Sequence, residues 1–212
     1  ANGTVINMDD ITTMFVWIPR YAYKITSGYH TNADGTGNIE IEWLKGKTSI
    51  TATGKPIVEY NATTTENYTK FPDGYVVHPA FKADTAMGGT GEEISGFWVG
   101  KFESSNYQMA VNYENNEGLS NSSSDTLLYG IGDGANVTIK PNVTSWRKIN
   151  TTGIYNVCQN MTKAGNIHGL GADTITVMMQ NSQWGAVAYL SQSDYGNKQT
   201  TGENGVTENS GI

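Results

Sequence analysis

The chain has 212 residues, a formal net charge of −7 and a single cysteine. Its length fits one domain, residues 1–212, and is enough to bury a core without disulfides. The charged fraction of 16% lies below the roughly 25% usual for soluble proteins, and neutral polar residues and glycines take its place. We expect no nucleic acid partner, because a negatively charged protein repels the phosphate backbone.

The number of cysteines and the length of the apolar runs exclude further kinds of site and segment. Cys158 is alone, so the chain has no intrachain disulfide, thiolate zinc site or redox pair. No apolar run approaches the roughly 18 residues of a membrane span, so we expect no membrane insertion by this segment. The chain begins at Ala1 without methionine, and we expect a signal or anchor to have been removed upstream.

The first elements are predicted to be strands. Residues 14–25, "MFVWIPRYAYKI", alternate in polarity, and Pro19 forces an edge or a break between two strands. The Asp34-Gly35 turn signal, followed by alternation from Ile39, predicts a hairpin. The Thr-rich stretch 48–70 is typical of a long loop or weak edge strands.

The middle of the chain contains further strands and a polar loop. "DGYVVHPAF" predicts a short strand, and residues 97–102 predict a buried one. The Asn- and Ser-rich stretch 112–125 indicates a surface loop. "ANVTIKPNVTSW" predicts a strand, a proline turn and a second strand end.

Two helices are predicted in the last third. Residues 152–161 carry apolar residues at helical spacing, which places Cys158 on the stripe that faces the core. Within "MMQNSQWGAVAYL", Trp184, Val187 and Ala188 recur at i, i+3 and i+4 and predict a short helix capped by Asn181. We expect Trp184 to pack against a sheet that contains the first and the middle strands.

Three tryptophans, Trp17, Trp98 and Trp184, lie among apolar neighbours in the sequence. We therefore expect all three in the core. The alternative is that a tryptophan on the surface stacks on a sugar ring.

Oxygen-bearing side chains suggest one candidate metal site. "NADGTGNIE" spaces them as calcium loops do, although not as an EF-hand does. The weak calcium candidates are Asn32, Asp34, Asn38 and Glu40. The three histidines, His30, His78 and His168, show no paired spacing, and His78 before Pro79 is expected to be packed or in a turn.

Catalytic patterns are weak. No G-x-S-x-G elbow occurs, so nothing predicts a hydrolytic serine. A pair of carboxylates for glycan cleavage remains an alternative, although neither the order nor the spacing of the acidic residues favours it. Its candidate members are Glu92, Glu93, Glu103 and Glu114.

Eight Asn-X-Ser/Thr sequons are candidate glycosylation sites and weakly favour an extracellular protein. They begin at Asn2, Asn61, Asn67, Asn121, Asn136, Asn142, Asn150 and Asn160.

Four motifs occur in a fixed order, and together they resemble the formylglycine-generating-enzyme-like branch of the C-type lectin fold. The order is similar, too, to a group of bacterial surface and prophage-type proteins built on "WVWIPR", "WVGKFE" and "NSEWGAVAYL". The resemblance covers about Met8 to Tyr195. The matching residues are Val16, Ile18 and Pro19, then Phe97, Val99 and Glu103, then Val143, Ser145 and Trp146, then Gln183, Trp184 and Ala188.

The chain departs from that family in two ways. The family enzyme binds copper through a cysteine pair, whereas this chain has Cys158 alone; the resemblance therefore does not imply catalysis. The family continues into a Gly-rich segment, whereas this sequence ends at Ile212. We expect a fragment that lacks an upstream anchor and that C-terminal segment, or a domain completed by another chain.

These observations predict an α+β, C-type-lectin-like domain with short twisted antiparallel sheets, two helices and long polar loops. The first hypothesis is a non-enzymatic extracellular binding or adhesion module on a cell surface or phage particle, without a cofactor, that binds a glycan or protein on a host or neighbouring cell. The second is a structural subunit of a filament, pilus or virion that binds copies of itself. The third and weakest is a glycan-cleaving enzyme.

Overall fold

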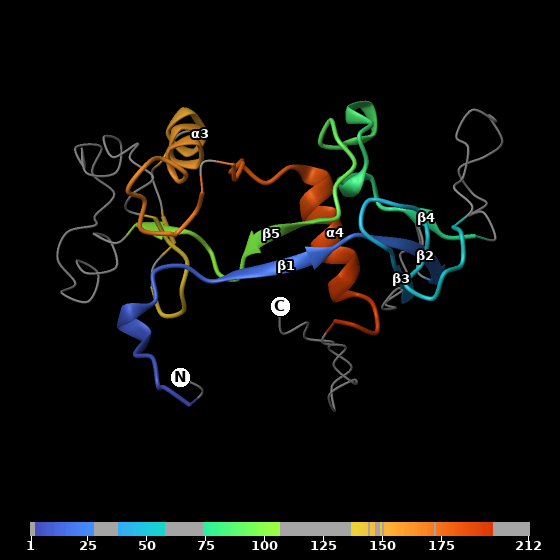
Figure 1. Cartoon of the computed structure of the whole chain (residues 1–212), viewed down its shortest axis with the longest axis horizontal. Coiled ribbons are helices and arrows are strands. Elements are labelled where there is room, and N and C mark those ends of the chain that lie inside the picture. The colour runs from blue at the N-terminus through green and yellow to red at the C-terminus, as the bar shows by residue number, and fades with distance from the viewer. Residues whose placement is uncertain are drawn as a thin grey trace. The chain divides into compact units, whose positions relative to one another are not determined.

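The computed structural model describes residues 3–27, 38–57, 74–106, 137–143, 145–146, 149, 151–171 and 173–196. It is a mixed α+β fold with short antiparallel sheets and two α-helices (Figure 1). The strands are β1 (Phe15–Pro19), β2 (Tyr21–Ser27), β3 (Asn38–Trp43), β4 (Val76–Val77), β5 (Gly96–Gly100), β6 (Ser105–Asn106) and β7 (Val137–Thr138). The helices are α3 (Thr151–Asn160) and α4 (Asn181–Ser191), with 3-10 turns η1 (Met8–Asp10), η2 (Pro79–Phe81) and η3 (Thr85–Met87).

The chain forms two compact units. The first comprises Ala1–Val16 and Val99–Met178, and the second comprises Trp17–Trp98 and Met179–Ile212. The chain therefore passes between the units within β1 and within β5. The assignment of both units to one domain, residues 1–212, stays a prediction from the sequence.

The second unit contains a three-stranded antiparallel sheet in the order β3-β2-β4. The strand pairing of the predicted hairpin is confirmed, because β2 pairs with β3 from Tyr21↔Trp43 to Ser27↔Asn38, and its predicted Asp34-Gly35 turn lies outside the described residues. Side chains alternate across a strand. Tyr21 and Ile41 are consequently buried on one face, while Lys24 pairs with Glu40 on the other.

Buried aromatic rings join this sheet to η2 and α4. Tyr21 is fully buried, and its phenol donates a hydrogen bond of 2.6 Å to the carbonyl of Ala186 in α4. Burial moves the pKa of this phenol far above its ordinary value. The ring of Tyr21 lies edge-on to Phe81 and tilted against His78. The hydrogen bond and the ring contacts fix α4 to the sheet over a long sequence separation.

His78 is part of this packing. It is buried, its Nδ1 accepts the N–H of Ala80, and its ring also contacts Tyr23 and Tyr189. Burial lowers its pKa to about 4, so the ring is neutral at physiological pH. The expectation of a packed histidine before Pro79 is confirmed.

The first unit has a separate apolar core. Val137 and Ile139, at and after β7, pack with Val157 and Met161 at the end of α3. The helix predicted over 152–161 is confirmed within one residue. Of the residues on its predicted apolar stripe, Val157 is buried, whereas Ile154 is 37% exposed and Cys158 is half-buried. Burial raises the pKa of the Cys158 thiol.

The orientation predicted for the second helix is wrong. Trp184 is 66% exposed, and the buried residues of α4 are Gln183, Ala186 and Leu190, which face η2 and β3. Gln183 sits at the helix start, where its side chain accepts the N–H of Gln180 at 2.9 Å. The helix therefore begins at Asn181, with Gln180 rather than Asn181 as its cap. This hydrogen bond makes burial of a polar residue acceptable, and the buried face is rotated away from the tryptophan.

Two substitutions in α4 test this orientation. Leu190→Ala should lower the free energy of unfolding by about 2 to 4 kcal/mol because it empties a packed site. Trp184→Ala should lower it by less than about 1 kcal/mol because the ring is mostly in water. Urea unfolding of both variants measures the difference, and a larger loss for Trp184→Ala would place the tryptophan in the core after all.

Candidate functional site: an exposed tryptophan pair

The candidate site lies on the strands β1 and β5. Their sequences, "FVWIP" and "GFWVG", have few polar residues and a tryptophan at the centre of each. Backbone hydrogen bonds join Lys101 to Met14 and Arg20 to Ser95, and Figure 1 shows the strands running in opposite directions. This antiparallel register places Trp17 directly opposite Trp98.

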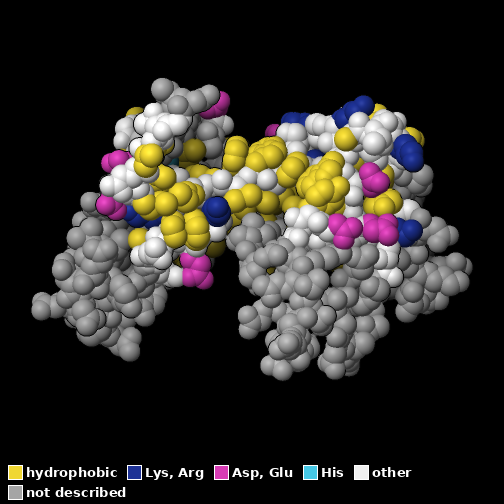
Figure 2. Space-filling view, turned by 90° about the horizontal axis from the view of Figure 1, so that it is seen from below, with side chains coloured by type: hydrophobic (Ala, Val, Ile, Leu, Met, Phe, Trp, Pro, Cys, Tyr) yellow, Lys and Arg dark blue, Asp and Glu magenta, His cyan; other side chains and the backbone are white. Residues whose placement is uncertain are grey.

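Both tryptophans of this pair reach the surface, which corrects the expectation that they are core residues. Trp98 is 64% exposed and Trp17 is 39% exposed, whereas Ile18, the next residue along β1, is buried at 2%. Alternation explains the correction: one face of the strand pair is buried by Ile18, so the adjacent tryptophans lie on the other. Figure 2 shows hydrophobic side chains gathered at the surface over this part of the chain.

The two indole rings contact each other. Their centroids are 5.2 Å apart and the ring planes are inclined by 57°. This is a favourable tilted arrangement for an aromatic pair. The two rings therefore do not form one flat surface.

Gly96 is the residue that allows Trp17 to take this position. A Cβ atom at Gly96 would lie 2.5 Å from Cζ2 of Trp17 and 2.4 Å from the carbonyl oxygen of Ile18. Both distances are shorter than atoms tolerate, and the backbone of Gly96 has a φ of 153°. Only glycine fits here without a shift of the ring or the strand.

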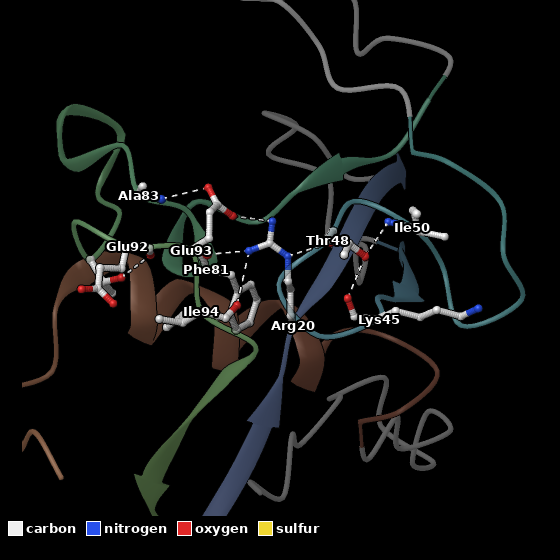
Figure 3. Close-up of polar contacts among 10 residues, drawn as sticks. Arg20, Lys45, Thr48, Ile50, Phe81, Ala83, Glu92, Glu93 and Ile94 are labelled. Atoms are coloured by element: carbon white, nitrogen blue, oxygen red, sulfur yellow. Dashed lines mark hydrogen bonds and ion pairs between the residues drawn. The ribbon is translucent and has the colours of Figure 1, made fainter. Parts of the chain in front are cut away.

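Arg20 fixes the end of the strand pair (Figure 3). Its side chain is buried, and its guanidinium donates to the carbonyl oxygens of Thr48 at 3.0 Å, Phe81 at 2.6 Å and Ile94 at 3.3 Å. It also forms an ion pair of 2.6 Å with Glu93. Because Ile94 and Glu93 precede β5, the guanidinium ties the end of β1 to the start of β5.

Two of the four carboxylates considered for catalysis have structural contacts of their own. Glu93 binds Arg20 with one oxygen and accepts the N–H of Ala83 with the other. Glu103, in the other unit, accepts the hydroxyl of Ser145. Glu92 is exposed and engages Thr90 through its backbone carbonyl rather than its carboxylate. Glu114 lies outside the described residues.

The calcium candidates are only partly described. Asn32 and Asp34 lie outside the described residues, and Asn38 is the first residue of β3, where it pairs with Ser27. The carboxylate of Glu40 accepts the phenol of Tyr75 at 2.7 Å, and burial together with this bond raises the pKa of that phenol to about 12. Within the described ranges, no three His, Cys, Asp or Glu side chains are grouped to hold a metal ion.

Two sequons fall on described asparagines. Asn142 is exposed in a turn and has a φ of 59°, a left-handed conformation that asparagine tolerates well. Asn160 ends α3 and is half-buried. The other candidates lie outside the described residues and stay predictions: Asn2, Asn61, Asn67, Asn121, Asn136 and Asn150.

Replacing Glu93 tests the support of the strand pair. Glu93→Gln should lower the free energy of unfolding by about 1 to 3 kcal/mol, because the buried guanidinium loses its countercharge. Glu92→Gln is the matched control and should change stability by less than about 0.5 kcal/mol. Thermal or urea unfolding compares the two. Equal effects would show that the ion pair does not support this fold.

Comparison with known proteins adds no relative. No family model, curated protein or solved structure matches the chain. In the part of the chain that the structure describes, no helix has both the length and the apolar character that a membrane crossing requires. The mixed α+β fold and the exposed tryptophan pair are therefore the observations on which a function is proposed.

Proposed function

We propose that this protein is a non-enzymatic, extracellular ligand-binding or adhesion module that binds a glycan through Trp17 and Trp98. The observation that carries the proposal is the exposure of both rings on one face of a strand pair. Large aromatic side chains held together in water are unusual on a monomeric protein and mark binding sites. Indole faces are suited to the C–H groups of a sugar ring, which are apolar on one side.

The scaffold supports the same proposal. Two of the four motifs behind the resemblance to the C-type lectin fold lie on the paired strands β1 and β5, through Val16, Ile18 and Pro19 on one strand and Phe97 and Val99 on the other. We propose a C-type-lectin-like scaffold on this basis. In such an arrangement a rigid framework carries the binding groups at its surface, either on a cell or on a phage particle.

The proposal is a binding role because two of the four acidic side chains considered for catalysis already have partners. Glu93 neutralises Arg20, and Glu103 accepts a hydroxyl from Ser145. A general acid requires a carboxyl group with a perturbed environment next to the substrate. The tryptophan pair provides contact area and no proton donor of this kind.

A second candidate function is self-assembly as a subunit of a filament, pilus or virion. The observation that favours it is the exposure of large apolar residues in the first unit. Val5 is 93% exposed and Ile175 is 86% exposed, and neither is explained by a sugar site. A partner chain would remove both from water.

Substitution of the pair tests the proposed function. Trp17→Ala and Trp98→Ala should each weaken glycan binding at least tenfold, equivalent to about 1.4 kcal/mol, because each removes a ring that contacts the ligand. Trp184→Ala is the matched control, since it removes an equally exposed tryptophan on α4. A glycan array followed by calorimetry on the bound glycans measures the change.

Two results would contradict the proposal. The first is that no glycan binds the folded protein, and the second is that Trp184→Ala weakens binding as much as the pair variants do. Sedimentation of the same samples separates the second candidate. Association that grows with protein concentration, in the absence of glycan binding, would favour assembly.

A further inference from the structure

The geometry and charge of the tryptophan pair define a narrower ligand class. We propose that the pair takes a single neutral sugar unit of a soluble glycan, and that Gly96 is the positioning residue that sets the angle between the rings. This inference rests on the proposed function and specifies the ligand of the same site. It depends on three observations: the inclination of the rings, the absence of charge on the strands, and the contact between Gly96 and Trp17.

The inclination of the rings favours one sugar over a flat surface. The planes differ by 57° and the centroids are 5.2 Å apart. A flat, ordered polysaccharide surface can lie against one ring but not against both at once. A single sugar that rests on the exposed face of one indole would also contact the edge of the other, because the rings are adjacent and inclined.

The charges around the pair favour a neutral ligand. Neither β1 nor β5 contains a charged residue. Arg20, which follows β1, is buried and neutralised by Glu93, so its charge is not offered to a ligand. The chain as a whole has a net charge of −7. The two strands therefore offer no countercharge to sialic acids, uronic acids or sulfated sugars, and the net negative charge of the chain repels them at long range.

Gly96 controls the position of the Trp17 ring. The space that a methyl group at Gly96 would need is already occupied by Cζ2 and Cε2 of Trp17, at 2.5 and 2.8 Å. An alanine must therefore push the indole outward or shift the strand. Either movement changes the angle between the two rings that contact the sugar, although no atom of Gly96 needs to touch the ligand.

The experiment compares three probe classes on the wild-type protein. These are soluble neutral oligomers of glucose, galactose and N-acetylglucosamine, their sialylated or uronic-acid counterparts, and insoluble cellulose and chitin. We expect binding to at least one neutral oligomer, with a Kd that does not change as NaCl is raised. We expect neither the acidic series nor the insoluble polymers to be retained.

Two sets of variants test the single site and the role of Gly96. If one sugar touches both rings, the Trp17→Ala, Trp98→Ala double variant should lose less affinity than the sum of the two single losses, because the rings are in contact and act together. Gly96→Ala should weaken binding at least tenfold. Gly100→Ala is its control on the same strand, because its closest Cβ contact of 3.2 Å requires only a small adjustment. Circular dichroism and melting show whether each variant is folded, and the double variant tests the single site even if Gly96→Ala does not fold.

The outcomes separate this inference from the proposed function. Binding of acidic glycans with a strong salt dependence, retention on flat insoluble polymers, or losses that add in the double variant would each overturn the single neutral site while glycan binding itself stands. Unchanged affinity in folded Gly96→Ala would overturn the positioning role. If the wild-type protein binds none of the probes, the proposed function fails and this inference fails with it.

Discussion

Taking a guanidinium out of water has a large energetic cost unless each of its nitrogens finds an acceptor and the charge finds a counterion. Arg20 meets both conditions, with three backbone carbonyls and the carboxylate of Glu93. Those partners come from segments 28 to 74 residues away in sequence. The positions of these segments therefore depend on one side chain. At this side chain the strand that carries Trp17 ends and the strand that carries Trp98 begins.

The tryptophan pair follows from this constraint. With the end of β1 held against the start of β5, the alternation of side chains leaves no choice of face. Ile18 is buried, so Trp17 and Trp98 must point away from the core. The exposed rings are stabilised by each other and by the close approach of Trp17 to Gly96, and they remain accessible to a ligand.

The sequence predicted the elements better than their orientations. Period-2 alternation, Pro19 and the Asp34-Gly35 signal predicted β1, β2 and the hairpin, because these signals are local. The exposure of Trp17, Trp98 and Trp184 was not predicted, because hydrophobicity alone places large aromatic residues inside. On α4, the buried face is decided by the hydrogen bond between Gln183 and Gln180, which no hydrophobic pattern shows. The tryptophan at the centre of each strand is a local signal for the register of β1 against β5. The partners of Arg20 have no such signal, because they depend on contacts between distant segments.

Trp17 and Trp98 form one coupled pair at the surface, and circular dichroism tests this coupling directly. Two indoles with centroids 5.2 Å apart and planes inclined by 57° should give an exciton couplet in the far-ultraviolet spectrum of the folded protein. Trp17→Phe and Trp98→Phe should each abolish the couplet, and Trp184→Phe should leave it unchanged. A spectrum without the couplet, or one that survives either substitution in the pair, would contradict the account.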